Sequence, residues 1–294
     1  MEGGFSLKTA TVGILGLGLM GGSLALSLKG KCKRLLGFDS HPPTLELALS
    51  KGIIDHALPH PQPLIIPEGG SQRERGVDIL ILATPVPSII QTINQLPSIH
   101  PPCIVMDIGS TKRDILEAMS QLPAGYDPIG GHPICGRETL GLQNADANLY
   151  QGAPFVITPL PRTTRHALRI TKQIISAIGA DLIEMTAADH DRILAFTSHL
   201  PFLLASSLAR STLHATRSTP LIGPGFRSTS RLAGTPAHMM LGILKSNRDN
   251  MLDALHGMQA QLAELEAALS SEDFAKLESL LNEARTTYQS LTGN

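Results

Sequence analysis

The 294-residue sequence contains no tryptophan, and aromatic residues make up only 3% of it. So few aromatic side chains leave no platform on which nucleic-acid bases would stack. The formal net charge is −1, so no general electrostatic field attracts nucleic acid or an acidic membrane surface. We therefore expect no nucleic-acid partner.

Cysteine is also scarce. Cys32, Cys103 and Cys135 show no metal-type pairing and cannot form a closed set of disulfides, which is typical of a reducing compartment. The N-terminus lacks the basic and apolar segments of a signal peptide, and we identify no apolar run of membrane-spanning length. These features favour a cytoplasmic protein without a membrane partner.

Short apolar segments alternate with helical patterns through the first half of the chain. We predict strands at 11–15, 35–39, 77–83, 104–107, 154–158 and 181–185, with helices at 22–29 and 44–50 among those between them. The early segments are continuously apolar, as parallel strands covered on both faces are. The pattern predicts an α/β doubly wound sheet over residues 1–186, with residues 58–76 as a surface loop.

After residue 186 the pattern is helical only, and the chain length favours a second domain over 187–294. We expect one long apolar helix at 187–210 that Pro201 kinks or interrupts, a loop at 216–226, and a long helix from Pro236. A last helix should start at the capping pattern of Ser270 and Asp273.

An apolar seam follows the helix that begins at Pro236. It comprises Met251, Leu255, Met258, Leu262, Leu265 and Leu269. Such spacing packs one helix against another. The partner helix belongs either to the same chain or to a second copy in a homodimer.

A glycine-rich turn follows the first predicted strand and opens a helix. It reads Gly16-Leu17-Gly18-Leu19-Met20-Gly21. In such a turn the first glycine permits a tight bend, the second lets the backbone approach a pyrophosphate, and the third allows close packing of the helix on the strand. Leu19 and Met20 occupy the helix start that would face the phosphates.

An acidic residue stands at the expected distance from this turn, since Asp39 ends the second strand. Its carboxylate can accept hydrogen bonds from ribose hydroxyls, and residues 40–44 include no Arg or Lys to neutralise a 2′-phosphate. The motif in this context therefore predicts NAD as the cofactor in preference to NADP. Thr84 and Pro85 close the next strand at the same edge, where Thr84 either contacts the cofactor or starts a turn.

Three further clusters carry candidate catalytic groups. Ser110 follows the strand at 104–107, and its hydroxyl either faces the cofactor cleft or caps the next helix. His132 lies in Gly-Gly-His-Pro at a strand end, where the glycines suggest backbone crowding around a bound molecule. The helical half adds His199 beside Pro201, and Arg227 with Arg231 in a segment of small residues.

Together these segments resemble the prephenate and arogenate dehydrogenase family. The resemblance is carried by GLGLMGGS, DIGSTK, GGHPICGRETLG, SHLP, GFRSTSRLAG and Asn247, which occur in family order over roughly residues 11–250. It implies a Rossmann-like NAD-binding domain, a helical dimerisation domain and an active site in the cleft between them.

By position, the resemblance implies a role for each candidate. His132 corresponds to the catalytic histidine that accepts a hydrogen bond from the substrate's C4 hydroxyl, and Ser110 to the serine that orients that hydroxyl and the nicotinamide. Arg231 corresponds to the carboxylate-binding arginine, and His199 and Glu138 to residues near the substrate side chain and the pocket mouth. The sequence departs from many relatives at Arg137 and from some at Met240.

The implied reaction is oxidative decarboxylation of prephenate to 4-hydroxyphenylpyruvate in L-tyrosine biosynthesis. A neutral imidazole is needed as the base, so activity should fall as pH drops through the pKa of the histidine, which is about 6.5 when unperturbed. Arogenate is the alternative substrate. Its ammonium group would favour a nearby carboxylate, and residues 229–240 contain none, which favours prephenate.

Three other hypotheses about the function compete with this one. A β-hydroxyacid dehydrogenase shares the glycine turn but uses a lysine in a glycine-rich helix start, which is absent after residue 186. A non-catalytic NAD sensor would leave Ser110, His132, His199 and Arg231 without a shared purpose. A metal site at Asp189-His190-Asp191, or at His132 with Cys135, lacks a coherent ligand set, and the first reads as a solvated helix start.

Overall fold

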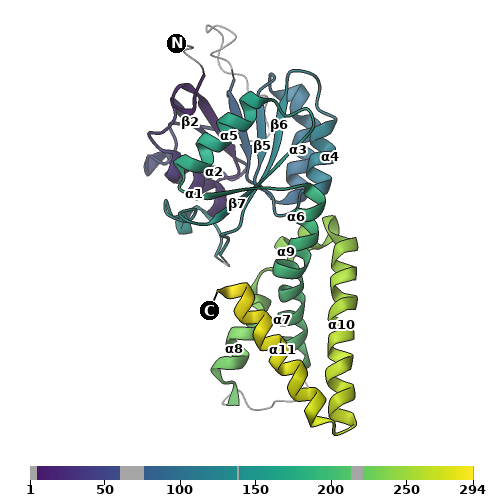
Figure 1. Ribbon diagram of the computed structural model, residues 1–294. Helices are drawn as coiled ribbons and strands as arrows, with labels where there is room; N and C mark the ends of the chain where they lie inside the picture. The colour runs from purple at the N-terminus through teal and green to yellow at the C-terminus, as the bar shows by residue number, and fades with distance from the viewer. Residues whose placement is uncertain (1–4, 60–75, 138, 213–220, 294) are drawn as a thin grey trace, which may run out of the picture.

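The computed structural model describes residues 5–59, 76–137, 139–212 and 221–293. An α/β domain is followed by a domain of helices, which extends away from it (Figure 1). The strands of the first domain form one sheet in the order β3-β2-β1-β4-β5-β6-β7-β8. Their bounds are β1 Thr11–Leu15, β2 Arg34–Asp39, β3 His56–Pro59, β4 Ile79–Leu82, β5 Ile104–Asp107, β6 Asp127–Pro133, β7 Pro154–Pro159 and β8 Asp181–Glu184.

All neighbouring strands of this sheet are parallel except β6 and β7, which run antiparallel. The order from β3 to β6 is that of a dinucleotide-binding sheet, in which the direction of winding reverses between β1 and β4. This reversal opens a crevice beyond the carboxyl ends of the two strands. The predicted doubly wound sheet is therefore confirmed.

Two of these strands were not predicted. β6 has the sequence DPIGGHP. Its two glycines and two prolines are residue types with low strand propensity, so the sequence does not predict a strand here. β3 is short, and it includes Leu58 and Pro59, which the sequence had placed in a surface loop. The rest of that predicted loop, residues 60–75, lies outside the described residues.

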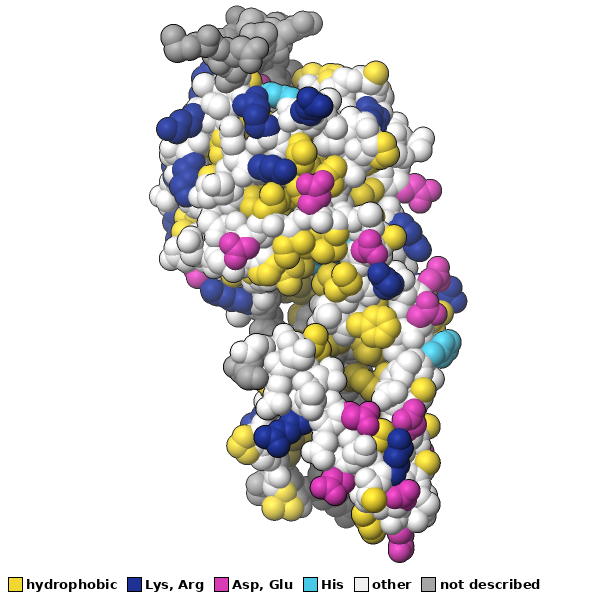
Figure 2. Space-filling model, in the orientation of Figure 1, with side chains coloured by type: hydrophobic (Ala, Val, Ile, Leu, Met, Phe, Trp, Pro, Cys, Tyr) yellow, Lys and Arg dark blue, Asp and Glu magenta, His cyan; other side chains and the backbone are white. Residues whose placement is uncertain are grey.

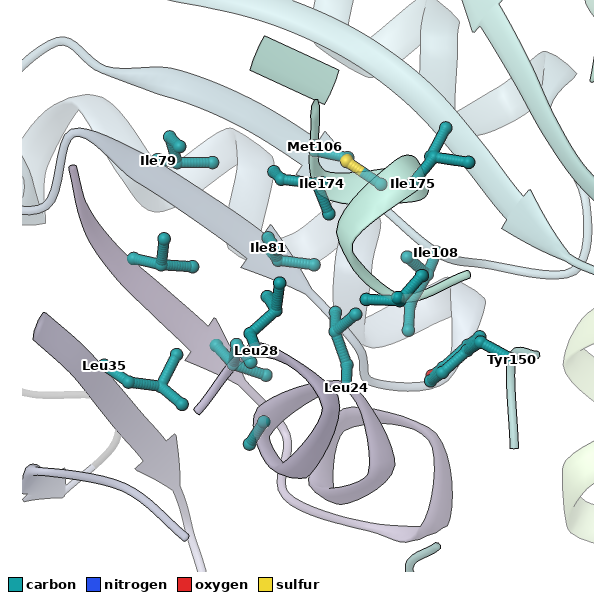
Figure 3. Packing of buried hydrophobic residues seen from close by; sticks show 14 of the residues in the cluster. Leu24, Leu28, Leu35, Ile79, Ile81, Met106, Ile108, Tyr150, Ile174 and Ile175 are labelled. Atoms are coloured by element: carbon teal, nitrogen blue, oxygen red, sulfur yellow. The ribbon is translucent and has the colours of Figure 1, made fainter. Parts of the chain in front are cut away.

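Helices cover both faces of the sheet, which explains the continuously apolar strands. They are α1 Leu19–Leu28, α2 Pro42–Ser50, α3 Val86–Ile99, α4 Arg113–Ser120 and α5 Arg165–Ala177, with short 3-10 turns at η1 Leu7–Thr9 and η3 Leu142–Asn144. In β4, Ile79 and Ile81 belong to one core cluster, and Leu80 and Leu82 belong to the other. Figure 3 shows the first cluster, where side chains of α1 and α5 pack against Ile79 and Ile81.

The helical domain contains α6 Ala187–Leu194, a π-helical turn η4 Ala195–His199, α7 Leu200–Ser211, α8 Pro224–Ser230, a 3-10 turn η6 Arg231–Gly234, α9 Ala237–Ser246, α10 Arg248–Ser270 and α11 Phe274–Thr292. The interruption expected from Pro201 is the π turn that precedes it. Proline has no N–H to donate to the carbonyl four residues earlier. The backbone N–H of Leu200 instead donates to the carbonyl of Ala195, five residues back.

Three boundaries in this domain differ from those expected. The helix predicted from Pro236 is divided at Asn247, whose φ of −118° and ψ of 26° break the helical path. The last helix is capped by Asp273, which accepts a hydrogen bond from the N–H of Lys276, whereas Ser270 ends α10. Residues 224–226, expected in a loop, start α8, and residues 216–220 lie outside the described part of the chain.

The stretch Ala187–Ser211 is long and apolar enough to cross a membrane by length and composition. The expectation that no run reaches that length is therefore wrong. One such helix is weak support for a membrane span, because core helices pass the same test. Within this stretch His190, Asp191 and His199 are buried and hydrogen-bonded inside the protein.

Candidate active site

The loop between β1 and α1 has glycine where a side chain cannot fit. Gly16 has a φ of 94°, and a Cβ there would lie 2.7 Å from the carbonyl oxygen of Ala83. A Cβ on Gly21 would lie 1.8 Å from the carbonyl oxygen of Gly16, so α1 can pack against the loop only with glycine at this position. At Gly18 a Cβ would meet nothing within 4 Å among the described residues. The loop is thus closed toward the sheet and open at Gly18.

Asp39 lies beside this loop because β2 is the neighbour of β1. Its carboxylate accepts hydrogen bonds from the backbone N–H of Leu17 at 2.8 Å and of His41 at 2.9 Å. Leu19 and Met20 form the first turn of α1, where backbone N–H groups have no partner within the helix and favour an anion. The crevice therefore offers an anion-binding helix start next to an acid that is fixed in place.

A pocket of about 370 Å³ lies at this crevice, and the two domains enclose it together. The α/β domain contributes Gly18, Leu19, Met20, Thr84, Pro85, Ser110, His132 and Arg137, and α9 contributes His238, Met239 and Ile243, among others. Thr84 Oγ1 is buried here without a hydrogen-bond partner among the described residues. An unsatisfied buried hydroxyl is costly, so its position fits a bound polar group.

The strand that carries His132 is held by a buried ion pair. Lys112 and Asp107 are fully buried and paired with each other. The Lys112 ammonium donates to the carbonyl oxygen of Gly131 at 2.5 Å, and the Asp107 carboxylate accepts from the backbone N–H of Gly109 at 2.8 Å and of Gly131 at 3.3 Å. Burial raises the pKa of Asp107 and lowers that of Lys112, and their mutual attraction opposes both shifts. The pair ties the His132 strand to the loop of Ser110.

The glycines before His132 are required by neighbouring strands, which corrects the expectation that they crowd a bound molecule. A Cβ on Gly131 would lie 2.8 Å from the carbonyl oxygen of Asp107. A Cβ on Gly130 would lie 2.1 Å from the hydroxyl of Thr158. Both glycines therefore serve close packing within the sheet.

Behind His132 lie two buried groups of α6. His132 Nδ1 is 2.8 Å from His190 Nε2, and His190 Nδ1 is 2.7 Å from Asp191 Oδ1. The Asp191 carboxylate also accepts from the backbone N–H groups of Lys112 at 2.7 Å and Arg113 at 2.9 Å, at the start of α4. A carboxylate at a helix N-terminus is well placed electrostatically.

The interpretation of Asp189-His190-Asp191 as a solvated helix start is therefore wrong for two of its three residues. The side chains of His190 and Asp191 are 0% and 2% exposed. Thr186 caps α6, and this fixed start places His190 four residues before buried Leu194, on the same helix face. That spacing was the available signal that His190 points inward.

The pocket environment holds His132 neutral. Burial lowers its pKa well below the ordinary value of 6.5, and the neighbouring basic groups His190, Lys112 and His199 act in the same direction when charged. Asp191 keeps a pKa below its usual value. Burial alone would raise it, but hydrogen bonds from His190 and from the backbone of Arg113 and Lys112 outweigh that effect. An ionised acid and a neutral base therefore coexist in one buried network.

The other expected substrate residues lie at different places. His199 is buried, with Nδ1 3.2 Å from Asn247 Nδ2, and burial lowers its pKa to about 4. Asn247 also donates to the carbonyl oxygen of Asp191 at 2.7 Å. Arg231 begins η6, and neither it nor His199 is among the described residues that line the pocket. Glu138 lies outside the described residues.

Arg137 and Met240 mark the departures from relatives. Arg137 lines the pocket and forms an ion pair with Asp146 at 2.9 Å. Met240 lies on α9 next to the pocket residue Met239. Of these two residues, Arg137 alone is among the described residues that line the pocket.

A larger hollow of about 850 Å³ lies on the outer face of α5 and contains none of the motif residues. Its charged lining consists of Lys8, Lys31, Arg165, Arg169 and Lys172. Figure 2 shows Lys and Arg side chains gathered on this face of the α/β domain. Because the catalytic candidates converge on the smaller pocket, that pocket is the candidate active site.

Family models match the two domains in turn. The model described as "Prephenate dehydrogenase, nucleotide-binding domain" matches residues 24–184, and "Prephenate dehydrogenase, dimerization domain" matches residues 186–283. Among curated relatives, the prephenate dehydrogenase of Bacillus subtilis is 29% identical over 276 residues, covering 91% of this chain and 72% of its own length. The cyclohexadienyl dehydrogenase of Zymomonas mobilis is 26% identical over 270 residues, covering 89% of this chain and 89% of its own length.

Solved structures are similar over nearly the whole chain. Prephenate dehydrogenase from A. aeolicus, in complex with hydroxyphenyl propionate and NAD+, has a TM-score of 0.84 and 28% identity, covering 98% of this chain and 100% of that one. Synechocystis arogenate dehydrogenase has a TM-score of 0.76 and 28% identity, covering 96% and 100%. With both domain models matched in order, the chain belongs to the prephenate dehydrogenase family.

Proposed function

We propose that this protein oxidises and decarboxylates prephenate to 4-hydroxyphenylpyruvate, with NAD as the hydride acceptor, in L-tyrosine biosynthesis. The observation that carries the proposal is the convergence of His132 and Ser110 on a single pocket with Thr84 and the open glycine Gly18. The family match and the A. aeolicus complex support it.

The residues of the crevice fit NAD. The open side of Gly18 and the free N–H groups at Leu19 and Met20 suit a pyrophosphate, and the unpartnered hydroxyl of Thr84 suits a polar group of the cofactor. Asp39 suits the ribose hydroxyls, and the lack of Lys or Arg at residues 40–44 favours NAD over NADP. When bound, NAD supplies the nicotinamide ring that accepts a hydride from C4 of the substrate.

His132 removes the proton of the C4 hydroxyl, and Ser110 orients that hydroxyl. His132 is suited to this task because it lines the pocket and burial keeps its ring neutral. The ketone that develops at C4 is conjugated through the ring to the carbon that bears the carboxylate, so loss of CO₂ makes the ring aromatic. General-base assistance of this kind contributes about 10²–10⁴-fold to a rate.

Arg231, His199 and Glu138 are proposed to recognise the rest of the substrate. The guanidinium of Arg231 suits a carboxylate because its planar group donates two parallel hydrogen bonds. Arg231→Gln should raise KM for prephenate with less change in kcat. An unchanged KM would remove Arg231 from this role.

The helical domain is proposed to form a homodimer, with the boundary between domains at residue 186. The support is an uncovered apolar surface on α10 and α11, in which Leu262, Leu269, Phe274, Leu281, Tyr288 and Leu291 are 54–81% exposed. The model that matches this region is described as a dimerization domain. We further propose that the protein acts in the cytoplasm.

The substrate is tested by comparing prephenate and arogenate in an assay of NAD reduction, with NADP as a second acceptor. We expect kcat/KM to be higher for prephenate than for arogenate, because residues 229–240 offer no carboxylate for an ammonium group. A higher kcat/KM with arogenate would instead indicate an arogenate dehydrogenase, the activity for which the Synechocystis relative is named. If neither prephenate nor arogenate led to reduction of the cofactor, the proposed function would be refuted.

A further inference from the structure

His190 and Asp191 form a continuous hydrogen-bonded line behind His132. The proposed function assigns neither residue a role. The line crosses the domain boundary, since His132 belongs to β6 and the other two residues belong to α6. His190 and Asp191 are almost completely buried, and the backbone N–H groups of Lys112 and Arg113 hold the carboxylate in place. Such a line can determine which ring nitrogen of His132 carries a proton.

The protons of this line can be assigned from its far end. Asp191 is ionised, so both of its oxygens only accept hydrogen bonds. His190 Nδ1 must therefore carry the hydrogen of the 2.7 Å contact to Asp191 Oδ1. If His190 carries this one hydrogen only, its Nε2 has a lone pair, which can accept a hydrogen from His132 Nδ1 across 2.8 Å.

We propose that His190 and Asp191 are positioning residues that hold His132 in the tautomer with Nδ1 protonated and Nε2 free to act as the base. The proposal rests on the proposed role of His132. When the substrate proton reaches Nε2, the imidazolium donates from Nδ1 to His190, and the charge of Asp191 stabilises it through that ring. The proton of the C4 hydroxyl ends on His132, and no further proton transfer is needed.

The opposite arrangement is chemically unproductive. A charged His190 would donate from Nε2 to His132 Nδ1, so the hydrogen of neutral His132 would lie on Nε2 and leave no lone pair for the substrate. The other basic groups near His132 do not replace His190 as an acceptor. The Lys112 ammonium is paired with Asp107, and His199 is hydrogen-bonded to Asn247.

The relay also makes the base depend on how the two domains fit together. Asn247, at the break between α9 and α10, donates to the backbone carbonyl of Asp191. Asp191 in turn caps α4 of the α/β domain. A displacement of α6 would therefore remove the hydrogen-bond acceptor of His132 as well as the cap of α4.

The test uses His190→Leu and His190→Gln in the full-length protein, with prephenate and NAD as substrates. Leucine removes the acceptor, whereas the Gln Oε1 can still accept a hydrogen bond near the position of Nε2. We expect kcat to fall at least about tenfold in His190→Leu, less in His190→Gln, and KM to change little in either. Asp189→Asn, a change at a half-exposed position in the same turn of α6, is the matched control and should retain normal kcat.

The pH profile separates the relay from a purely structural role. Loss of a neutral acceptor destabilises the imidazolium, so the acid limb of kcat/KM should move to lower pH in His190→Leu. If His190 were a cation, its removal would move this limb to higher pH and would overturn the proposal. NMR of histidine-labelled wild-type protein should show the hydrogen of His132 on Nδ1, and a hydrogen on Nε2 would equally overturn it.

His132→Asn distinguishes failure of the relay from failure of the proposed function. If His132→Asn is inactive while His190→Leu has normal kcat and an unshifted profile, only the relay is wrong. If His132→Asn itself turns over normally, the assignment of His132 as the base fails, and the relay fails with it.

Discussion

His132 has one ring nitrogen committed to His190, which leaves Nε2 as the nitrogen available to a substrate in the pocket. From the sequence, activity is expected to decline through the pKa of this histidine, for which only the unperturbed value of about 6.5 is known. The structure adds the direction of the shift, since burial lowers the pKa of His132 well below this value. The neutral base should therefore persist into acidic solution.

The pH dependence of kcat/KM follows from this shift. The active form is the neutral ring, so activity is present above the folded-state pKa and is lost as pH falls through it. We expect full kcat/KM at pH 6.5 and a decline only at lower pH, measured as NAD reduction over a pH series with protein stability checked at each point. A midpoint at or above 6.5 would show that His132 is more exposed to water than the structure indicates.

Substitution of Lys112 tests the buried ion pair with Asp107, which holds the strand that carries His132. Lys112→Met removes one buried charge and leaves Asp107 unpaired, which typically costs about 3–5 kcal/mol of unfolding free energy. The control is Lys29→Met, since Lys29 forms an ion pair with Asp55 at 2.6 Å with both side chains about 40% exposed, and such pairs contribute about 0–1 kcal/mol. Equal effects in urea unfolding would contradict an anchoring role for Lys112.

The turn between β1 and α1 shows which elements were predictable from sequence. Its motif, the strand before it and the acid that ends β2 were all predicted, because each rests on local residue chemistry. β6 was not predicted, because the sequence DPIGGHP has little strand propensity of its own and is extended through its pairing with β5 and β7. Likewise, His132 was identified by motif, whereas the line of His190 and Asp191 behind it depends on the packing of α6 against α4.

Gly21 and Gly18 form a matched pair for testing that turn. Gly21→Ala places a Cβ against the carbonyl oxygen of Gly16, so α1 must shift, and we expect a loss of about 1–3 kcal/mol in unfolding free energy. Gly18→Ala meets open space in the free protein and should change stability by less than about 0.5 kcal/mol. It should nevertheless weaken NAD binding, measured by calorimetry, because Gly18 lines the pocket. Unchanged affinity in Gly18→Ala would place the pyrophosphate elsewhere.

The exposed apolar residues of α10 and α11 concern the assembly as a whole. The sequence left open whether the seam on α10 packs within the chain or between copies. In the described chain Met251 is buried, whereas Leu262 and Leu269 toward the far end are more than half exposed. The structure therefore accounts for intramolecular packing at one end of the seam, and the proposed dimer would bury the other end.

Light scattering should find a dimer, and Leu281→Glu should weaken it. Burying a leucine contributes about 1.5–3 kcal/mol, so replacing it with a charge should raise the dissociation constant at least about tenfold. Ser50→Glu adds the same charge at an exposed position at the end of α2, in the other domain, and should leave the dimer intact. A monomeric wild-type protein at micromolar concentration would contradict the proposed assembly.

The chemistry assigned to the pocket depends on a neutral His132 beside the cofactor crevice. The decisive comparison is the initial rate of NAD reduction with prephenate by the wild-type protein and by His132→Asn. We expect the wild-type protein to release CO₂ and form 4-hydroxyphenylpyruvate, and kcat of the variant to fall by about 10²-fold or more with a smaller change in KM. Near-normal turnover by His132→Asn would contradict the assignment of this side chain as the base.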